Sequence, residues 1–212
     1  MIPNPKVLPR LQAILDVRAA SVGEEALDVA RAFLGGDARF IQIRAKTLPS
    51  GPFLDLCDAV VALAQPYRAT VIVNDRVDLA RLSGAAGVHV GQDDLPVAAA
   101  RQILGPDAIV GYSTHTIGQV EQALTLPISY LAVGPVFGTQ TKNTGYAAVG
   151  LDLVREAATR AGDVPIVAIG GITLETAPAV IAAGASCVAV ISDLLTGGNL
   201  AARVRAFLDA LR

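Results

Sequence analysis

Residues 165–192 read PIVAIGGITLETAPAVIAAGASCVAVIS and contain the pattern that decides the fold. Two short runs rich in β-branched residues, PIVAIG (165–170) and SCVAVIS (186–192), flank a stretch with helical spacing, LETAPAVIAAG (174–184). A strand, a helix and a second strand in this order predict two parallel strands joined by a right-handed crossover.

The same unit recurs along the whole chain. Further strand-like runs occupy residues 11–17, 39–44, 69–74, 86–91, 108–113 and 129–134. Eight strands, each followed by helical material, predict a single-domain (β/α)8 TIM barrel over residues 1–212. An open doubly wound sheet is the competing fold. It would usually carry a glycine-rich dinucleotide turn after its first strand, and LDVRAASVG (15–23) is not one.

Charge, hydropathy and cysteine content exclude several classes of protein. A net charge of −2 gives no basic field for nucleic acid. The apolar runs are too short to span a bilayer, and MIPNPKVLPR (1–10) lacks the apolar core of a signal peptide. Cys57 and Cys187 are far apart in apolar surroundings, which favours buried thiols. We therefore expect a cytoplasmic protein without nucleic-acid or membrane partners, and a homo-oligomer stays open.

The strand at 39–44 ends in polar and cationic residues. Alternation along a strand places three polar side chains on one face and three apolar ones on the other: Gln42, Arg44 and Lys46 against Ile41, Ile43 and Ala45. In a barrel, function collects where strands end. Two cations converging there favour a bound anion, although a solvated rim with counter-charges is the alternative.

Carboxylates follow the next two strands. Asp75 comes directly after the strand at 69–74, and Asp94 follows the strand at 86–91. Each could cap the helix that follows, with Pro96 in a first helical turn. Together they offer oxygen ligands to one space without a histidine or cysteine partner. That donor set suits Mg²⁺ sharing a phosphate.

The strand at 108–113 ends in a serine and is followed by a histidine, and the pattern leaves the roles of both open. Ser113 could donate to a phosphate oxygen or start a serine–threonine turn. His115 could act as a base or bond to nearby backbone. His89, inside its strand, is interpreted as structural.

Two regions of the sequence suit anions. Barrel enzymes often hold a phosphate after strands 7 and 8, where this chain has Gly170-Gly171 and Ser192. The loop GPVFGTQTK (134–142) adds two threonine hydroxyls and the charge of Lys142. With Arg44, Lys46 and a carboxylate-held metal, Lys142 would suit a diphosphate. Two phosphorylated small-molecule substrates are the natural interpretation.

These residues belong to seven motifs that resemble, in order, signatures of the thiamine phosphate synthase family. The motifs are IQIRAK (41–46), VNDRVDLA (73–80), GVHVGQDDLP (87–96), GYSTHT (111–116), GPVFGTQTK (134–142), AIGGIT (168–173) and VAVIS (188–192). The resemblance covers nearly the whole chain. It implies a (β/α)8 barrel and a transferase of thiamine biosynthesis that joins a pyrimidine diphosphate to a thiazole phosphate with Mg²⁺.

The resemblance also implies roles for individual positions. Asp75 and Asp94 would bind Mg²⁺, with Arg44, Ser113 and Lys142 acting on the diphosphate as catalytic groups. The pyrimidine diphosphate would be held by Gln42, Arg44, Lys46, Asn74, Ser113 and Lys142. The thiazole phosphate would be held by Thr139, Gln140, Thr141, Gly171, Ile191 and Ser192.

One position departs from the family pattern, and two other functions compete. Ala45 stands where the family usually has Glu, which puts catalytic efficiency in doubt more than identity. A thiazole tautomerase-like paralogue would use His115 as an acid–base residue and would not need the metal carboxylates. A non-catalytic sensor of phosphate ligands would keep the phosphate pocket alone.

Overall fold

The computed structural model describes residues 8–17, 23–138 and 147–212. Its strands form a closed barrel in sequence order, and all neighbouring strands, including the first and the last, are parallel. The strands are β1 Leu11–Asp16, β2 Phe40–Arg44, β3 Thr70–Asn74, β4 Gly87–Val90, β5 Ile109–Thr114, β6 Tyr130–Val133, β7 Ile166–Ile169 and β8 Cys187–Val190. The prediction of a (β/α)8 barrel is confirmed.

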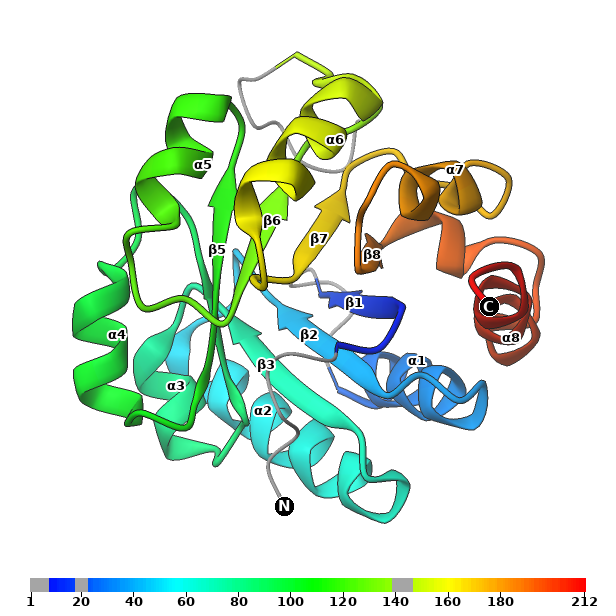
Figure 1. The fold of residues 1–212 in the computed structure, drawn as a ribbon. Coiled ribbons are helices and arrows are strands. Elements are labelled where there is room, and N and C mark those ends of the chain that lie inside the picture. Colours follow the sequence, from blue (N-terminus) through cyan, green and yellow to red (C-terminus); the bar gives the residue numbers. More distant parts are fainter. Residues whose placement is uncertain (1–7, 18–22, 139–146) are drawn as a thin grey trace.

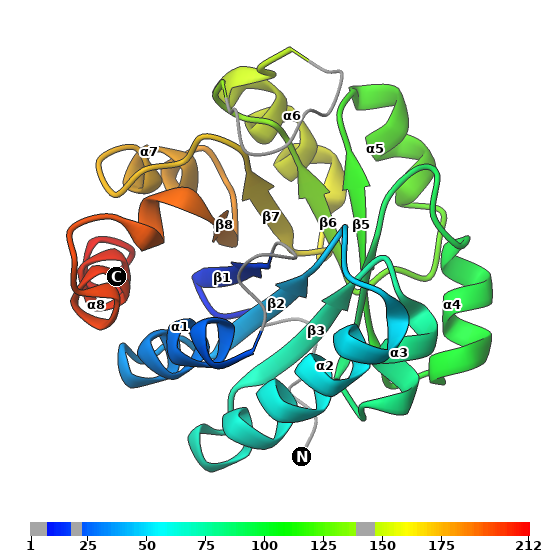
Figure 2. The same cartoon turned by 180° about the vertical axis from the view of Figure 1, so that it is seen from behind.

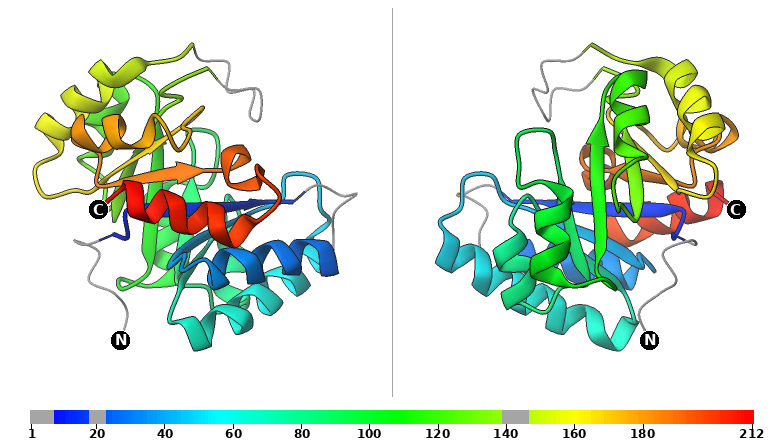
Figure 3. Two further views of the ribbon diagram at one scale, coloured as in Figure 1. Left: turned by 90° about the vertical axis from the view of Figure 1, so that its right-hand side faces the viewer. Right: turned by 60° about the vertical axis from the view of Figure 1, so that its left-hand side comes forward.

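Helices surround the barrel on its outside (Figure 1, Figure 2). They are α1 Glu24–Gly35, α2 Ser50–Ala64, α3 Val77–Leu82, α4 Val97–Leu104, α5 Ile117–Ala123, α6 Gly150–Ala161, α7 Ala177–Ala182 and α8 Leu200–Ala210. Two short 3₁₀ helices, η2 Gln65–Tyr67 and η3 Ser192–Leu195, follow α2 and β8. The side views of Figure 3 show α8 lying beside α1, which closes the outer ring.

The two faces of each strand pack into different layers. Ile41 and Ile43 on β2 are fully buried between the barrel and the helices, and Ala45 joins them. The inward side chains form a second cluster inside the barrel, in which Phe40 meets Tyr130 edge-on. The alternation predicted for β2 is therefore present, and it sends Gln42 and Arg44 towards the interior.

Both cysteines are buried free thiols, as predicted. Burial raises the pKa of the Cys57 thiol to about 12 and raises that of the Cys187 thiol further. Within the described part of the chain, no helix has the length and hydropathy needed to cross a bilayer.

Candidate active site

A pocket of about 860 Å³, including its open mouth, lies at the carboxyl ends of the strands. It is lined from every strand of the barrel or the loop that follows it. Seven of the residues predicted for substrate binding line it: Gln42, Arg44, Asn74, Ser113, Gly171, Ile191 and Ser192. The ends of the strands therefore bring together residues that are up to 150 positions apart in the sequence, as the barrel topology predicted.

Arg44 is oriented by an acidic residue from the neighbouring strand. Asp16 at the end of β1 pairs with Arg44 in the sheet register, and its carboxylate accepts a hydrogen bond from Arg44 Nη1. The two side chains are only 9% and 14% exposed. Such a pair fixes the guanidinium direction while leaving other N–H groups to face the pocket that Arg44 lines.

Asp75, Lys46 and Asp94 form a charged cluster beside this pocket. Lys46 Nζ makes an ion pair with Asp75 Oδ2, and the negative charge of Asp94 acts on the Asp75 carboxyl group. Burial raises the pKa of Asp75, Lys46 opposes that shift, and the negative charge of Asp94 adds to it. Asp75 also has a left-handed backbone, with φ of 63°, which is uncommon outside glycine and is found at functional sites.

Helix capping does not explain these two carboxylates. α3 begins at Val77 and α4 at Val97, and neither has a side-chain hydrogen bond at its N-cap. Asp94 Oδ2 instead accepts a hydrogen bond of 2.7 Å from the backbone N–H of Gly91. The capping alternative is therefore wrong for both residues, and Pro96 is the N-cap residue of α4, just before its first turn.

The donor set of this cluster fits a hard cation. Asp75 and Asp94 bring two carboxylates together, and mutual repulsion there favours a positive charge between them. Among the described residues, no group of three or more His, Cys, Asp and Glu side chains could hold a metal ion. A cation held here would need water or substrate oxygens as well, which is how Mg²⁺ usually binds.

Ser113 contacts a histidine, which in turn contacts a tyrosine. His89 Nε2 lies 2.8 Å from Ser113 Oγ, and His89 Nδ1 lies 2.8 Å from the hydroxyl of Tyr130. Burial raises the pKa of the Tyr130 hydroxyl well above its ordinary value, so the group stays protonated. A Cβ on Gly111 would lie 2.0 Å from the Tyr130 ring, so only glycine leaves room for it. His89 lies inside β4, as predicted, and it also lines the pocket.

His115 lies at the pocket rim and contacts backbone. Its Nδ1 meets the carbonyl oxygen of Gly134, and its backbone N–H donates to Gln119 Oε1 at 2.7 Å. The alternative in which this histidine bonds to nearby backbone is therefore present in the structure.

The loops after β6 and β7 pack tightly against each other. Gly170 and Gly171 have φ of 103° and 62°, and a Cβ on Gly171 would lie 2.5 Å from the carbonyl oxygen of Gly138. The N–H of Phe137 donates to the Gly170 carbonyl at 2.9 Å. These glycines thus admit the neighbouring loop, a requirement that the sequence alone did not reveal. Four predicted site residues of this loop lie outside the described residues: Thr139, Gln140, Thr141 and Lys142.

Two polar residues were missed by the sequence reasoning: Asp16, which contacts the pocket residue Arg44, and Gln12, which lines the pocket. Asp16 was missed because its role depends on the register of β1 against β2. Gln12 is 1% exposed and lines the pocket, and its Nε2 has no hydrogen-bond partner within the described part of the chain. A glutamine inside the apolar run LQAIL (11–15) was the signal that could have identified it.

A (β/α)8 barrel with a pocket at the carboxyl ends of its strands, lined by Arg44 and several polar side chains among apolar ones, is the arrangement of a TIM-barrel enzyme. The thiamine monophosphate synthase family matches residues 11–194. The chain therefore belongs to this family.

Individual relatives agree with this assignment. A thiamine-phosphate synthase from Anaeromyxobacter dehalogenans is 45% identical over 193 residues, covering 90% of this chain and 86% of that protein. A thiamine biosynthesis bifunctional protein from Symbiobacterium thermophilum is 42% identical over 211 residues, and this chain spans 44% of its length. The solved structure of thiamine phosphate pyrophosphorylase from Pyrococcus furiosus superposes with a TM-score of 0.85 at 28% identity, covering 98% of this chain and 96% of that one.

Proposed function

We propose that this protein is a thiamine-phosphate synthase. It condenses 4-amino-2-methyl-5-(diphosphooxymethyl)pyrimidine with 4-methyl-5-(2-phosphooxyethyl)thiazole to give thiamine phosphate and diphosphate. The observation that carries the proposal is the cluster of Asp75, Lys46 and Asp94 beside a pocket that contains Arg44 and Ser113. Family membership and the names of the relatives support it.

The first step breaks the bond between the pyrimidine methylene carbon and the bridging diphosphate oxygen. The electron pair leaves with the diphosphate, and the methylene carbon becomes carbocation-like. Mg²⁺ on Asp75 and Asp94, when bound, would neutralise the charge that develops on the leaving group. Arg44, pre-oriented by Asp16, and Lys46 add fixed positive charge. Fixed charges of this kind lower a barrier because they need no rearrangement as the reaction proceeds.

Binding of the pyrimidine diphosphate is assigned to the β2, β3 and β5 side of the pocket. Gln42 and Asn74 are buried and line the pocket, where their amides can pair with ring nitrogens and the amino group. Ser113, held by His89, donates to the diphosphate. Lys142 is proposed to join this group on the sequence resemblance.

The thiazole phosphate is assigned to the loops after β6, β7 and β8. Gly171, Ile191 and Ser192 line that side of the pocket, and the resemblance adds Thr139, Gln140 and Thr141. Positioned there, the thiazole ring nitrogen attacks the methylene carbon with its lone pair and forms the new carbon–nitrogen bond. No proton has to be removed from that nitrogen, so the reaction needs no general base.

The replacement of the family's usual Glu by Ala45 is compatible with this proposal. Ala45 is 7% exposed and packs in the layer between barrel and helices. Arg44 and Lys46 keep their acidic partners Asp16 and Asp75 without it. A cytoplasmic location and a homo-oligomer stay predictions of the sequence.

Incubation of the protein with each precursor alone and with both together tests the proposal against its rivals. A synthase forms thiamine phosphate only when both precursors are present. Conversion of a thiazole precursor on its own would support the tautomerase-like function through His115. Tight binding of thiazole phosphate without any product, at saturating concentrations of both precursors and Mg²⁺, would support a sensor.

A further inference from the structure

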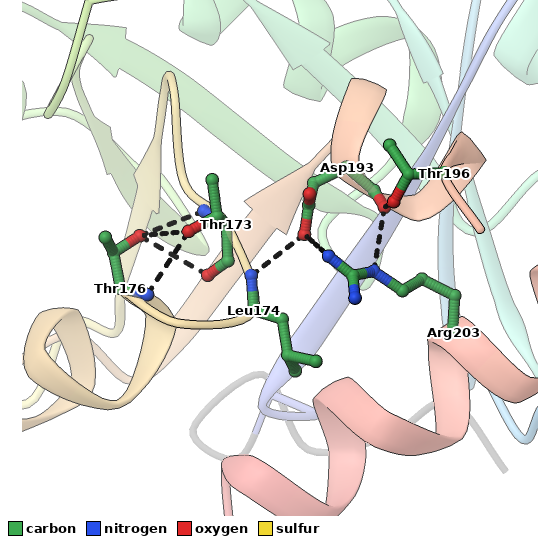
Figure 4. A network of polar contacts seen from close by, with 6 residues as sticks. All are labelled: Thr173, Leu174, Thr176, Asp193, Thr196 and Arg203. Carbon is green, nitrogen blue, oxygen red and sulfur yellow. Dashed lines mark hydrogen bonds and ion pairs between the residues drawn. The ribbon is translucent and has the colours of Figure 1, made fainter.

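Asp193, directly after the pocket residue Ser192, ties three segments together. Its Oδ2 accepts a hydrogen bond of 2.8 Å from the backbone N–H of Leu174 and forms an ion pair of 2.6 Å with Arg203 Nη2 (Figure 4). Arg203 Nε also donates to the Asp193 carbonyl oxygen at 3.1 Å. One carboxylate thus joins the loop after β7, the 3₁₀ helix η3 and the outer helix α8.

Both inner segments form a wall of the proposed thiazole phosphate site. Ser192 begins η3 and lines the pocket, and Gly171 lines it three positions before Leu174. The left-handed backbone at Gly170 and Gly171 lies outside any helix or strand. Glycine in such a loop permits many conformations, so the loop needs external contacts to hold a single one.

The turn that carries Leu174 is itself ordered by two threonines. The N–H of Thr173 donates to Thr176 Oγ1 at 2.9 Å, and the N–H of Thr176 lies 3.3 Å from Thr173 Oγ1 (Figure 4). This turn leads directly into α7. The hydrogen bond from Leu174 to Asp193 therefore connects an already ordered turn to η3. It fixes the distance between the loop after β7 and the loop after β8.

Asp193 is suited to positioning and not to ligand contact. Its side chain is 15% exposed, and Oδ2 is occupied by two donors. A free carboxylate beside a phosphate would repel it, and the Arg203 guanidinium compensates that charge. Arg203 is further held over the ring of Phe207, 5.7 Å from its centroid.

We propose that Asp193 is a positioning residue that holds the loops after β7 and β8 at the spacing the thiazole phosphate requires. Arg203 supports it from α8. The proposal rests on the proposed function, because it concerns the phosphate-bearing substrate of the same pocket. Asp193 is therefore expected to affect binding of the thiazole phosphate and not binding of the pyrimidine diphosphate.

Steady-state kinetics of Asp193→Ala, with each substrate varied in turn, test this role. Loss of the charged hydrogen bond is expected to raise KM for the thiazole phosphate by about tenfold, with KM for the pyrimidine diphosphate within about twofold of wild type. Asp193→Asn keeps an acceptor for the Leu174 N–H and is expected to recover most of the loss. Asp209→Ala removes an exposed ion pair with Arg212 at the C-terminal end of α8 and serves as the matched control, with both KM values expected to stay unchanged.

Equal increases in both KM values, or no change in either, would overturn the proposal. Hydrogen exchange of residues 170–174 gives a second readout that needs no catalysis. Faster exchange of this segment is expected in Asp193→Ala and not in Asp209→Ala, and unchanged exchange would count against the proposal. Absence of turnover by the wild-type protein would instead refute the proposed function, so the two failures are distinguishable.

Discussion

Substitution of Asp94 separates a metal-binding role from a structural one. Asp94 Oδ2 accepts a hydrogen bond from the Gly91 N–H at 2.7 Å, and the negative charge of Asp94 helps to raise the pKa of Asp75. Asp94→Asn keeps an oxygen acceptor for Gly91 but removes the negative charge. Asp94→Ala removes both. If the carboxylate binds a cation, the two variants are expected to differ in thermal stability but to lose catalytic activity to the same extent.

The expected sizes follow from these contacts. Loss of one hydrogen bond in Asp94→Ala is expected to cost about 1 kcal/mol, or a fall in Tm of about 2–4 °C for a chain of this size. Asp94→Asn is expected to keep the wild-type Tm. Both variants are expected to lose at least about a hundredfold in kcat, the scale of removing a group that stabilises developing charge.

The assay follows thiamine phosphate formation over a Mg²⁺ titration, with thermal unfolding of each variant. The half-saturating Mg²⁺ concentration is expected to rise in Asp94→Asn. Asp107→Asn, an exposed carboxylate just before β5 at the other end of the barrel, is the control and is expected to behave as wild type. Wild-type kcat and wild-type Mg²⁺ dependence in Asp94→Asn would refute the metal-binding role.

Three further substitutions test other parts of the pocket. Gly171→Ala forces a side chain into a left-handed backbone and places its Cβ 2.5 Å from the Gly138 carbonyl oxygen. The free energy of unfolding is therefore expected to fall by at least about 1–2 kcal/mol. An unchanged Tm would contradict this close approach. Asp16→Ala leaves Arg44 without its acidic partner. The KM for the pyrimidine diphosphate is therefore expected to rise by about tenfold in steady-state kinetics. A wild-type KM would show that the pair does not position the guanidinium. Lys142→Ala is expected to lose most of its activity with the diphosphate substrate, and wild-type kinetics would remove that lysine from the mechanism.

Much of the fold could be predicted from the sequence because the patterns that specify it lie within short segments of the chain. The alternation of polar and apolar residues in β2 correctly sent Gln42 and Arg44 inward and Ala45 outward. The repeated strand–helix order predicted the barrel, since parallel strands in one sheet leave few other topologies. Barrel topology then predicted that strand ends meet, which placed Ser113 and Ser192 in one pocket.

Contacts that depend on the register between two strands, or on close packing of side chains, could not be predicted from the sequence in this way. Asp16 reaches Arg44 only because β1 and β2 pair at those positions. The roles of His89 and Tyr130 depend on side chains meeting across the barrel interior. Helix capping is the usual use of an aspartate after a strand, but Asp75 has a left-handed backbone and the N-cap residue of α3 is Arg76.

Phosphorus NMR of one reaction mixture tests the central claim most directly. The mixture contains the protein, both precursors and Mg²⁺, and a parallel mixture contains a chelator in excess. The proposed function predicts that thiamine phosphate and free diphosphate accumulate in equal amounts with Mg²⁺, and that neither forms with the chelator. Absence of thiamine phosphate at saturating precursors and Mg²⁺ would contradict it.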